Sequence, residues 1–515
     1  MIKKKLFLND KFIILFIFIL GFIFNYYFGS IGVFPLDTFS HFDTGYLVLN
    51  GYGPFRDYWA ATGSFLDFSQ AFFFLIFGTT WFAYIFHGSI FNGILSVSTF
   101  VLLRKLNLEK IYSFFYSFCF SLTGYTISGT PFVDLHSIFF SLLAIYFFIF
   151  AILDHKKIYW LFIPIFLGIA FFSKQTPAGY VIFLLSILIL IYILKNKNIK
   201  IFYYLLTSSF FFLFLIIFIF YVYKINFDDF FLQFFLFPGE IAKQRLNDLH
   251  LDIKNSILQF KFIHLSFLLY ATVVIINFDV KKLYIFFGLA ILYLSSILHQ
   301  LLTKNQVFIH FLTIVYLAML HSEIKFYLIK NKFYKKILIF VILFFCFSIT
   351  LKYHRLYNVQ KYFMEMRYID LKKFEKAEIL DTRLLGLKWV NPFNSSPQSE
   401  IQELIRIKNI LKDEKSSVML ITNYQFFSSL NQKIYYQPNR WYTSDGISYP
   451  VKNSKYFLEY KNFIKNKIVF NKISAIYIID NVFPLIDFFE SNCFEVERAT
   501  DTMYKYTIKN CIDFL

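Results

Sequence analysis

Residues 34–70, FPLDTFSHFDTGYLVLNGYGPFRDYWAATGSFLDFSQ, decide how the rest of the chain is interpreted. This stretch lies between strongly apolar segments, yet it is too polar to lie in lipid, where unsatisfied polar groups are costly. It contains the titratable residues Asp37, His41, Asp43, Arg56, Asp57 and Asp67. A polar loop of this length so early in an apolar chain is either a tether or part of an active site.

The composition predicts a polytopic α-helical membrane protein. Of the 515 residues, 57% are hydrophobic and 76 are Phe, and no soluble core could bury so much apolar surface. The net charge of +18 fits the excess of Lys and Arg in cytoplasmic loops. Because no basic cluster marks a soluble face, we expect no nucleic-acid partner.

The apolar segments predict about eleven transmembrane helices. The lysines that precede the first of them place the N-terminus in the cytoplasm, since cytoplasmic flanks are basic. The expected spans are 12–28, 79–103, 111–128, 138–152, 158–172, 179–194, 202–223, 262–278, 283–300, 307–322 and 337–351.

Loop charges support this count. Each loop that is expected to be cytoplasmic carries a cluster of Lys or Arg, and the short outer loops carry at most one basic residue each. The first outer loop, 29–78, and a longer segment, 224–260, then lie outside. Within the first loop, residues 64–77 predict a helix that lies at the membrane interface.

A change in composition near Lys352 divides the chain into a transmembrane domain, 1–351, and a C-terminal extracytoplasmic α/β domain, 352–515, called the tail below. In the tail, 397–413 and 455–466 predict helices, and 416–422 and 473–480 predict buried strands. Ser395 or Ser396 is the expected cap of the first of these helices.

Four cysteines are present. Cys119 and Cys346 lie in apolar runs and are expected in the core. Cys493 and Cys511 lie in the tail, where a disulfide can form outside the cytoplasm. No cysteine spacing is typical of a zinc site.

The predicted topology brings polar residues of several outer loops to one side of the membrane. Besides the first loop, these are Asp134, His136, Lys174, Gln175, His299 and Lys304. A carboxylate can take a proton from an acceptor, and a Lys or Arg can neutralise a phosphate leaving group. Histidines beside scattered Asp residues are only a weak signal for a divalent metal, so we predict no cofactor.

The first outer loop resembles that of the GT-C superfamily of membrane glycosyltransferases, in the branch of bacterial protein mannosyltransferases and lipid A aminoarabinose transferases. That branch has an Asp after the first span, then Gly-x-x-Pro-(Tyr/Phe)-x-Asp, then a small-residue turn. This chain has Asp37, Gly51-Tyr52-Gly53-Pro54-Phe55-Arg56-Asp57 and Thr62-Gly63-Ser64. The usual Gly-Pro or Pro-Pro of the last turn is Gly63-Ser64 here. Asp134 and Lys174 match an acidic residue and a basic residue of later outer loops.

The resemblance implies an inverting glycosyltransferase of a bacterial inner membrane. Its donor would be a polyprenyl-phosphate sugar, and its acceptor a lipid, a glycan or a protein. Asp37 and Asp134 would be catalytic, with Asp37 as the base. The expected substrate-binding residues are His41, Asp43, Arg56, Asp57, His136, Lys174, Gln175, His299 and Lys304, among which Asp43 and Asp57 also suit a structural role.

Two other functions fit part of the pattern. A polysaccharide polymerase or ligase shares the topology and the lipid-linked substrates, but its large outer loop usually lies later in the chain. A transporter usually has repeated halves and broken helices near the middle of the membrane, and neither is evident in this sequence.

Overall fold

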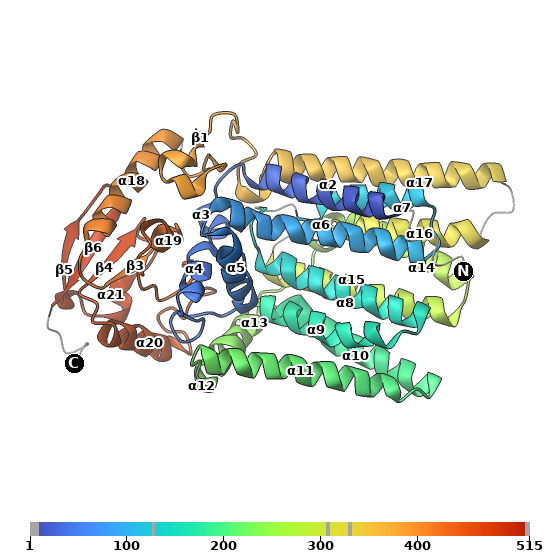
Figure 1. Cartoon of the computed structure of the whole chain (residues 1–515), viewed down its shortest axis with the longest axis horizontal. Coiled ribbons are helices and arrows are strands. Elements are labelled where there is room, and N and C mark those ends of the chain that lie inside the picture. Colours follow the sequence, from blue (N-terminus) through green and yellow to red (C-terminus); the bar gives the residue numbers. More distant parts are fainter. Residues whose placement is uncertain (1–9, 126–128, 305–308, 328–331, 395, 510–515) are drawn as a thin grey trace.

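The computed structural model describes residues 10–125, 129–304, 309–327, 332–394 and 396–509. Long helices lie side by side, and a small C-terminal sheet covers one end of the bundle (Figure 1). We call this end the sheet side and the opposite end the far side.

A helix lies on each range that the sequence predicted as a span. Among the described residues, seven helices are long and apolar enough to cross a membrane, which is consistent with a membrane protein. The helices on the predicted ranges are α2 (Lys11–Gly29), α6 (Trp81–Lys105), α7 (Lys110–Thr123), α8 (Val133–Asp154), α9 (Lys157–Ser173), α10 (Gln175–Asn196), α11 (Lys200–Val222), α14 (Lys261–Ile276), α15 (Val280–Thr303), α16 (Leu312–Tyr327) and α17 (Lys332–Tyr353).

Two of these helices mark the extremes of packing. Helix α8 lies at the centre of the bundle, and 94% of the residues in its apolar stretch are buried. The corresponding fraction for α11 is 6%, and its Phe210 and Phe214 side chains are 64% and 63% exposed. An apolar face of this size is stable only against lipid or another apolar partner, so α11 gives the most direct sign of a membrane environment.

Residues 29–78, called the first polar loop below, fold into three helices between the bundle and the sheet (Figure 1). They are α3 (Pro35–Thr38), α4 (Phe42–Leu49) and α5 (Ser64–Phe77). Helix α5 has the predicted bounds because Gly63 and Gly78 flank it with φ of 76°, a conformation that glycine adopts without a steric penalty. Its Leu66 and Phe74 are buried, and Phe72 is exposed.

Segment 224–260 is largely helical, although the sequence analysis predicted only an outer segment there. It contains α12 (Phe227–Phe231), the π-helical turn η1 (Leu232–Leu236), α13 (Phe237–Asn247) and the π-helical turn η2 (Ile253–Leu258). Pro238 lies in the first turn of α13, where proline is tolerated because that N–H would be unpaired.

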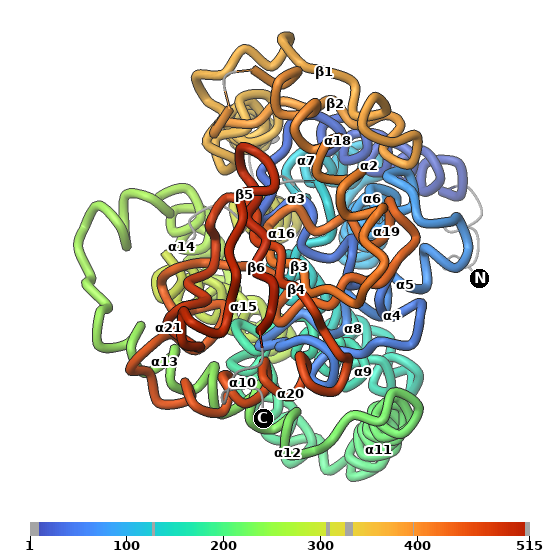
Figure 2. Tube along the Cα trace, turned by 90° about the vertical axis from the view of Figure 1, so that its left-hand side faces the viewer, coloured from blue at the N-terminus to red at the C-terminus, as the bar shows by residue number. Residues whose placement is uncertain are grey.

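The tail contains a four-stranded mixed sheet with strand order β3-β4-β6-β5. Strands β3 (Val418–Ile421) and β4 (Ala475–Ile479) are parallel and wholly buried, as expected for strands covered on both faces. The antiparallel strands β6 (Met503–Ile508) and β5 (Phe494–Arg498) were not predicted. Viewed from the sheet side, the sheet lies over the end of the bundle (Figure 2).

The two predicted tail helices are present. Helix α18 (Pro397–Asp413) has the predicted bounds, and the Ser396 hydroxyl accepts a hydrogen bond from the Ser399 amide at 3.3 Å, which makes Ser396 the cap. Helix α20 (Phe457–Phe470) is longer than predicted. The remaining short elements of the tail include β1 (Glu375–Lys376), β2 (Lys388–Trp389), α19 (Phe427–Asn431) and α21 (Leu485–Phe488). Cys511 lies outside the described residues, so its pairing with Cys493 stays a prediction.

Glycines allow the close approach of α2, α6 and the segment before α8. A Cβ atom on Gly129 would overlap the Cα atom of Gly29, and one on Gly88 would lie 2.5 Å from the Gly129 carbonyl oxygen. The Asn25 side-chain amide donates to that same carbonyl at 2.9 Å. The start of the first polar loop is therefore fixed against the segment that leads into α8.

We predict that Gly129→Ala destabilises the protein more than Gly386→Ala does. Both glycines have positive φ, 75° and 95°, but nothing lies within 4 Å of a Cβ on Gly386. The overlap at Gly129 should cost a further 1–3 kcal/mol, roughly the range for overpacked interiors. Thermal unfolding of the purified protein in one detergent measures the difference, and equal melting temperatures would contradict the packing described here.

Candidate functional site

A cavity of about 460 Å³ lies on the sheet side of the bundle. Its walls come from the first polar loop, the ends of α8, α9, α10 and α15, helix α13 and the tail. Its charged and polar lining includes Asp37, His41, Asp134, Lys174, Gln175 and Arg245. Its apolar lining includes Phe132, Phe171, Tyr180, Phe234, Phe235, Leu302 and, from the tail, Trp441 and Ile447. The cavity therefore joins a charged region to an apolar wall.

Asp37 lies in α3 and is partly buried. Its carboxylate forms no hydrogen bond or ion pair with any other described residue. Burial raises the pKa of Asp37, the charge of Asp134 raises it further, and Lys174 opposes the rise, which gives a pKa of about 7. Near neutral pH this carboxylate can both accept and hold a proton, as a general base requires.

Asp134 is fully engaged by neighbouring groups. The Lys174 ammonium donates to both of its oxygens, at 2.8 and 2.7 Å, and His299 Nε2 lies 2.6 Å from Oδ1. The other ring nitrogen of His299 lies 3.1 Å from the Thr176 hydroxyl. An anion that is already neutralised is a weak base, so the geometry favours Asp134 as the residue that positions Lys174 and not as a second base.

Arg245 is a cavity residue that the sequence analysis did not select. It lies in α13 and is partly buried. Its guanidinium forms no hydrogen bond or ion pair with a described residue, in contrast to the paired Lys174. An unpaired guanidinium in a partly apolar cavity is well suited to bind phosphate. The signal in the sequence was the single Arg of segment 224–260, which was predicted to lie outside.

His41 is held by a buried carboxylate. Its Nδ1 atom lies 2.7 Å from Asp67 Oδ1. Burial and the charge of Arg440 lower the pKa of His41 to about 4, although Asp67 opposes this shift, so the imidazole is neutral at pH 7. With its proton on the nitrogen that faces Asp67, His41 presents Nε2 as a hydrogen-bond acceptor.

Asp67 joins the first polar loop to the tail. It accepts hydrogen bonds from the hydroxyls of Thr44, at 2.6 Å, and Tyr58, at 2.8 Å. Arg440 of the tail lies 3.1 Å from its second oxygen, and the same guanidinium donates to the Thr62 carbonyl. Asp67 and Arg440 are both fully buried. The sequence offered one signal for this pair, an Asp in a helix that is rich in aromatic residues.

Asp43 lies outside the cavity lining and contacts the tail. Its two carboxylate oxygens accept hydrogen bonds from the backbone amides of Ser428 and Ser429, at 3.0 and 2.9 Å. Its own amide donates to the Gln425 carbonyl at 2.9 Å. These contacts cap the start of α19, so the structure assigns Asp43 a docking contact.

Arg56 and Asp57 also lie outside the cavity lining and stabilise the turn that contains them. The Asp57 carboxylate accepts from the Gly53 amide at 2.8 Å and from Arg56 Nε at 2.7 Å. Arg56 donates to the Tyr223 carbonyl at 2.7 Å, and Lys467 of α20 lies 3.4 Å from Asp57. Both side chains are therefore engaged in contacts that hold the loop.

The remaining predicted site residues have different surroundings. His136 is buried outside the cavity lining, with its ring nitrogens 3.3 Å from the Tyr125 hydroxyl and 3.2 Å from His87. The Gln175 amide lines the cavity but donates to the carbonyls of Ala61 and Phe234, at 2.7 and 2.8 Å. Lys304 is exposed at the end of α15 and does not line the cavity.

No family model matches the chain, and no curated protein matches it. Among the described residues, no group of three or more His, Cys, Asp or Glu side chains is placed to hold a metal ion.

We predict that Arg440→Met destabilises the protein by about 3–5 kcal/mol, because it leaves the Asp67 carboxylate buried without its cation. The matched control is Arg406→Met, since the Arg406 side chain is 69% exposed in its ion pair with Glu403. Exposed pairs contribute about 0–1 kcal/mol. Denaturant unfolding followed by tryptophan fluorescence measures both variants, and a similar small loss in both would show that the buried pair does not hold the junction.

Proposed function

We propose that this protein is an inverting glycosyltransferase that moves a sugar from a polyprenyl-phosphate donor to an acceptor. The observation that carries the proposal is Asp37, a carboxylate with a pKa of about 7 and without a partner among the described residues. It lies in a cavity that also contains Lys174 and Arg245. The resemblance of the first loop to GT-C enzymes supports the same reaction.

In the proposed reaction, Asp37 takes the proton of an acceptor hydroxyl or amine. The acceptor atom then attacks the anomeric carbon of the donor sugar. The bond from that carbon to the phosphate oxygen breaks, and its electron pair leaves with the polyprenyl phosphate. Arg245 and Lys174 would stabilise the negative charge on the leaving group.

His41 is a second candidate base in the cavity, and the pKa values favour Asp37 over it. A base with a pKa of about 7 is matched to neutral pH, whereas one with a pKa of about 4 accepts a proton far less readily. We therefore propose Asp37 as the base and His41 as a hydrogen-bond acceptor that orients the substrate.

The proposed setting is a bacterial inner membrane with about eleven spans, the N-terminus in the cytoplasm and the tail outside. The charge distribution supports this orientation. On the far side, Arg104, Lys105 and Lys110 lie at the connection of α6 and α7, and Lys156 and Lys157 at the connection of α8 and α9. The apolar wall of the cavity and the half-exposed helix α5 would accommodate the first isoprene units of the donor.

We predict that Asp37→Asn lowers the rate of sugar release by about 10²–10⁴-fold, the usual contribution of a general base. Purified protein is incubated with a panel of radiolabelled polyprenyl-phosphate sugars, with water, glycans, lipid A and peptides as acceptors. In the wild type, the rate at low donor concentration should rise with pH up to about 7 and then level off, because only deprotonated Asp37 accepts the proton.

The control for this variant is Asp248→Asn, which changes an exposed carboxylate just after α13. It should retain the wild-type rate and pH profile. If a donor reacts equally in the wild type and in folded Asp37→Asn, the base is another group and the proposed mechanism is wrong.

We also predict that Arg245→Met raises the KM for the donor at least tenfold, because it removes the unpaired cation of the cavity. Lys243→Met is the matched control, since Lys243 lies on the same helix but is exposed, with its ammonium 3.6 Å from Glu240. Initial rates against donor concentration separate the two. An unchanged KM in Arg245→Met would exclude this residue from phosphate binding.

A further inference from the structure

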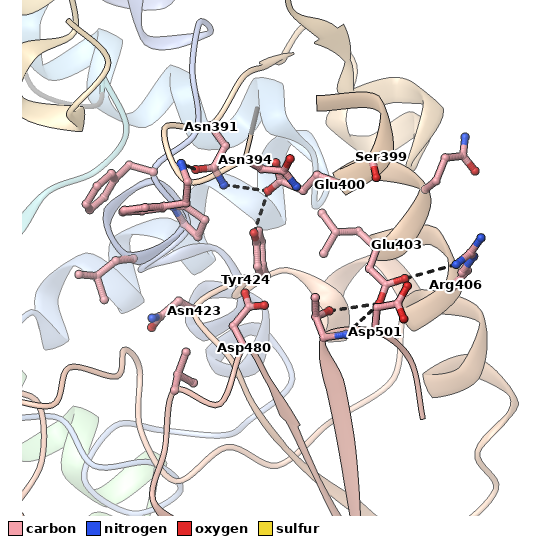
Figure 3. A pocket seen from close by; sticks show the side chains of 18 residues that line it. Asn391, Asn394, Ser399, Glu400, Glu403, Arg406, Asn423, Tyr424, Asp480 and Asp501 are labelled. Atoms are coloured by element: carbon pink, nitrogen blue, oxygen red, sulfur yellow. Dashed lines mark hydrogen bonds and ion pairs between the residues drawn. The ribbon is translucent and has the colours of Figure 1, made fainter. Parts of the chain in front are cut away.

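A second cavity, of about 630 Å³, lies between the tail and residues 34–36 (Figure 3). We call it the tail cavity. Asn423 and Tyr424, which follow β3, and Asp480 and Val482, which follow β4, form one side of it. Helix α18 forms another side. The cavity thus lies at the carboxyl ends of two parallel strands, where α/β sheets bind their ligands.

Carboxylates and side-chain amides make up most of the polar lining of this tail cavity. Glu400, Glu403, Asp480 and Asp501 line it, against one cation, Arg406. The Asp480 carboxylate is exposed and forms no hydrogen bond or ion pair with a described residue. An anionic ligand would be repelled here, whereas a ligand rich in hydrogen-bond donors would be bound.

Glu400 is a buried carboxylate in the wall of this cavity. It is 94% buried, and its Oε1 atom accepts hydrogen bonds from Asn391, at 2.8 Å, and Tyr424, at 2.7 Å (Figure 3). The buried Trp389 indole interacts with the same carboxylate. Glu400 is therefore held by protein groups and fixes one wall of the cavity.

Two aromatic side chains complete the lining. The rings of Phe34 and Phe393 lie 5.3 Å apart, and Phe393 is 67% exposed. The C–H faces of a sugar ring pack on aromatic rings, while its hydroxyls donate to carboxylates and amides. The lining combines these rings with four carboxylates and four side-chain amides, and this combination suits the many hydroxyls of a sugar.

Helix α3 connects the tail cavity to the candidate active site. Phe34, Pro35 and Leu36 line the tail cavity, and Leu36 and Asp37 line the other cavity. A ligand in the tail cavity would therefore lie next to the residue that is proposed as the base.

We propose that the tail cavity binds a hydroxyl-rich glycan part of the acceptor that carries no negative charge. This inference rests on the proposed function, because it gives the acceptor of that reaction a chemical class. Phe393 would bind the face of a sugar ring, and Asp480 and Glu403 would accept hydrogen bonds from its hydroxyls.

The test is binding of full-length protein in nanodiscs to an array of neutral, amino and acidic glycans, with peptides as a further set. Neutral or amino glycans should bind, and Phe393→Ala and Asp480→Asn should each weaken that binding about five- to tenfold, as for residues at the centre of a binding site. The matched controls are Phe470→Ala, whose side chain is 84% exposed, and Asp413→Asn at the exposed end of α18. Both should bind as the wild type does.

Asp37→Asn separates this inference from the proposed function, since it should bind the same glycans while it loses transfer. Binding of neutral or amino glycans that the two cavity variants weaken supports the inference, whether or not a donor is turned over. Absence of glycan binding, preference for acidic glycans or for peptides, or equal binding by the cavity variants and their controls would overturn it.

Discussion

The buried ion pair between Asp67 and Arg440 is the constraint on which the arrangement of the two parts of the chain depends. Two fully buried charges are stable only when each is paired and hydrogen-bonded, because their removal from water is costly. Thr44, Tyr58 and His41 satisfy the carboxylate, and Thr62 accepts from the guanidinium. The first polar loop and the tail can therefore separate only if both charges are rehydrated together.

Other contacts add to this junction, and they determine the shape of the candidate active site. Asp43 receives two backbone amides of the tail, and Asp57 lies near Lys467 of α20. As a result, Trp441 and Ile447 of the tail form part of the lining of the candidate active site. The first polar loop therefore has two roles, because one of its carboxylates lines the candidate active site and others stabilise the junction with the tail. Asp37 has no partner among the described residues. Asp43, Asp57 and Asp67 stabilise the contact of the loop with the tail.

Much of the helical architecture could be predicted from the sequence, because hydrophobic length and loop charge are local properties. Helix α5 begins and ends where glycines flank it, and α18 has the predicted bounds because proline and a serine cap define its start. The roles of single polar residues were harder to predict. Asp134 pairs with Lys174 and His299, and Arg245 has no partner in the part of the chain that the structure describes. Both facts depend on which helices meet in space. Strands β5 (FEVER) and β6 (MYKYTI) were missed although both alternate apolar and polar residues, the pattern of a half-buried strand.

Helices α8 and α11 have similar apolar composition but opposite surroundings, and this difference has a consequence for sequence variation. Almost every side chain of α8 touches protein, so its volume and shape are fixed by neighbours, and even one methylene group more or less is felt. In α11 only Ile201 and Ser208 are buried. Phe212 and Phe220 pack against α9 and α12. The exposed positions of α11 need only remain apolar, so Leu, Ile, Phe and Val are interchangeable there. Mutational tolerance in this chain should therefore follow contact with protein, and hydrophobicity alone would not reveal it.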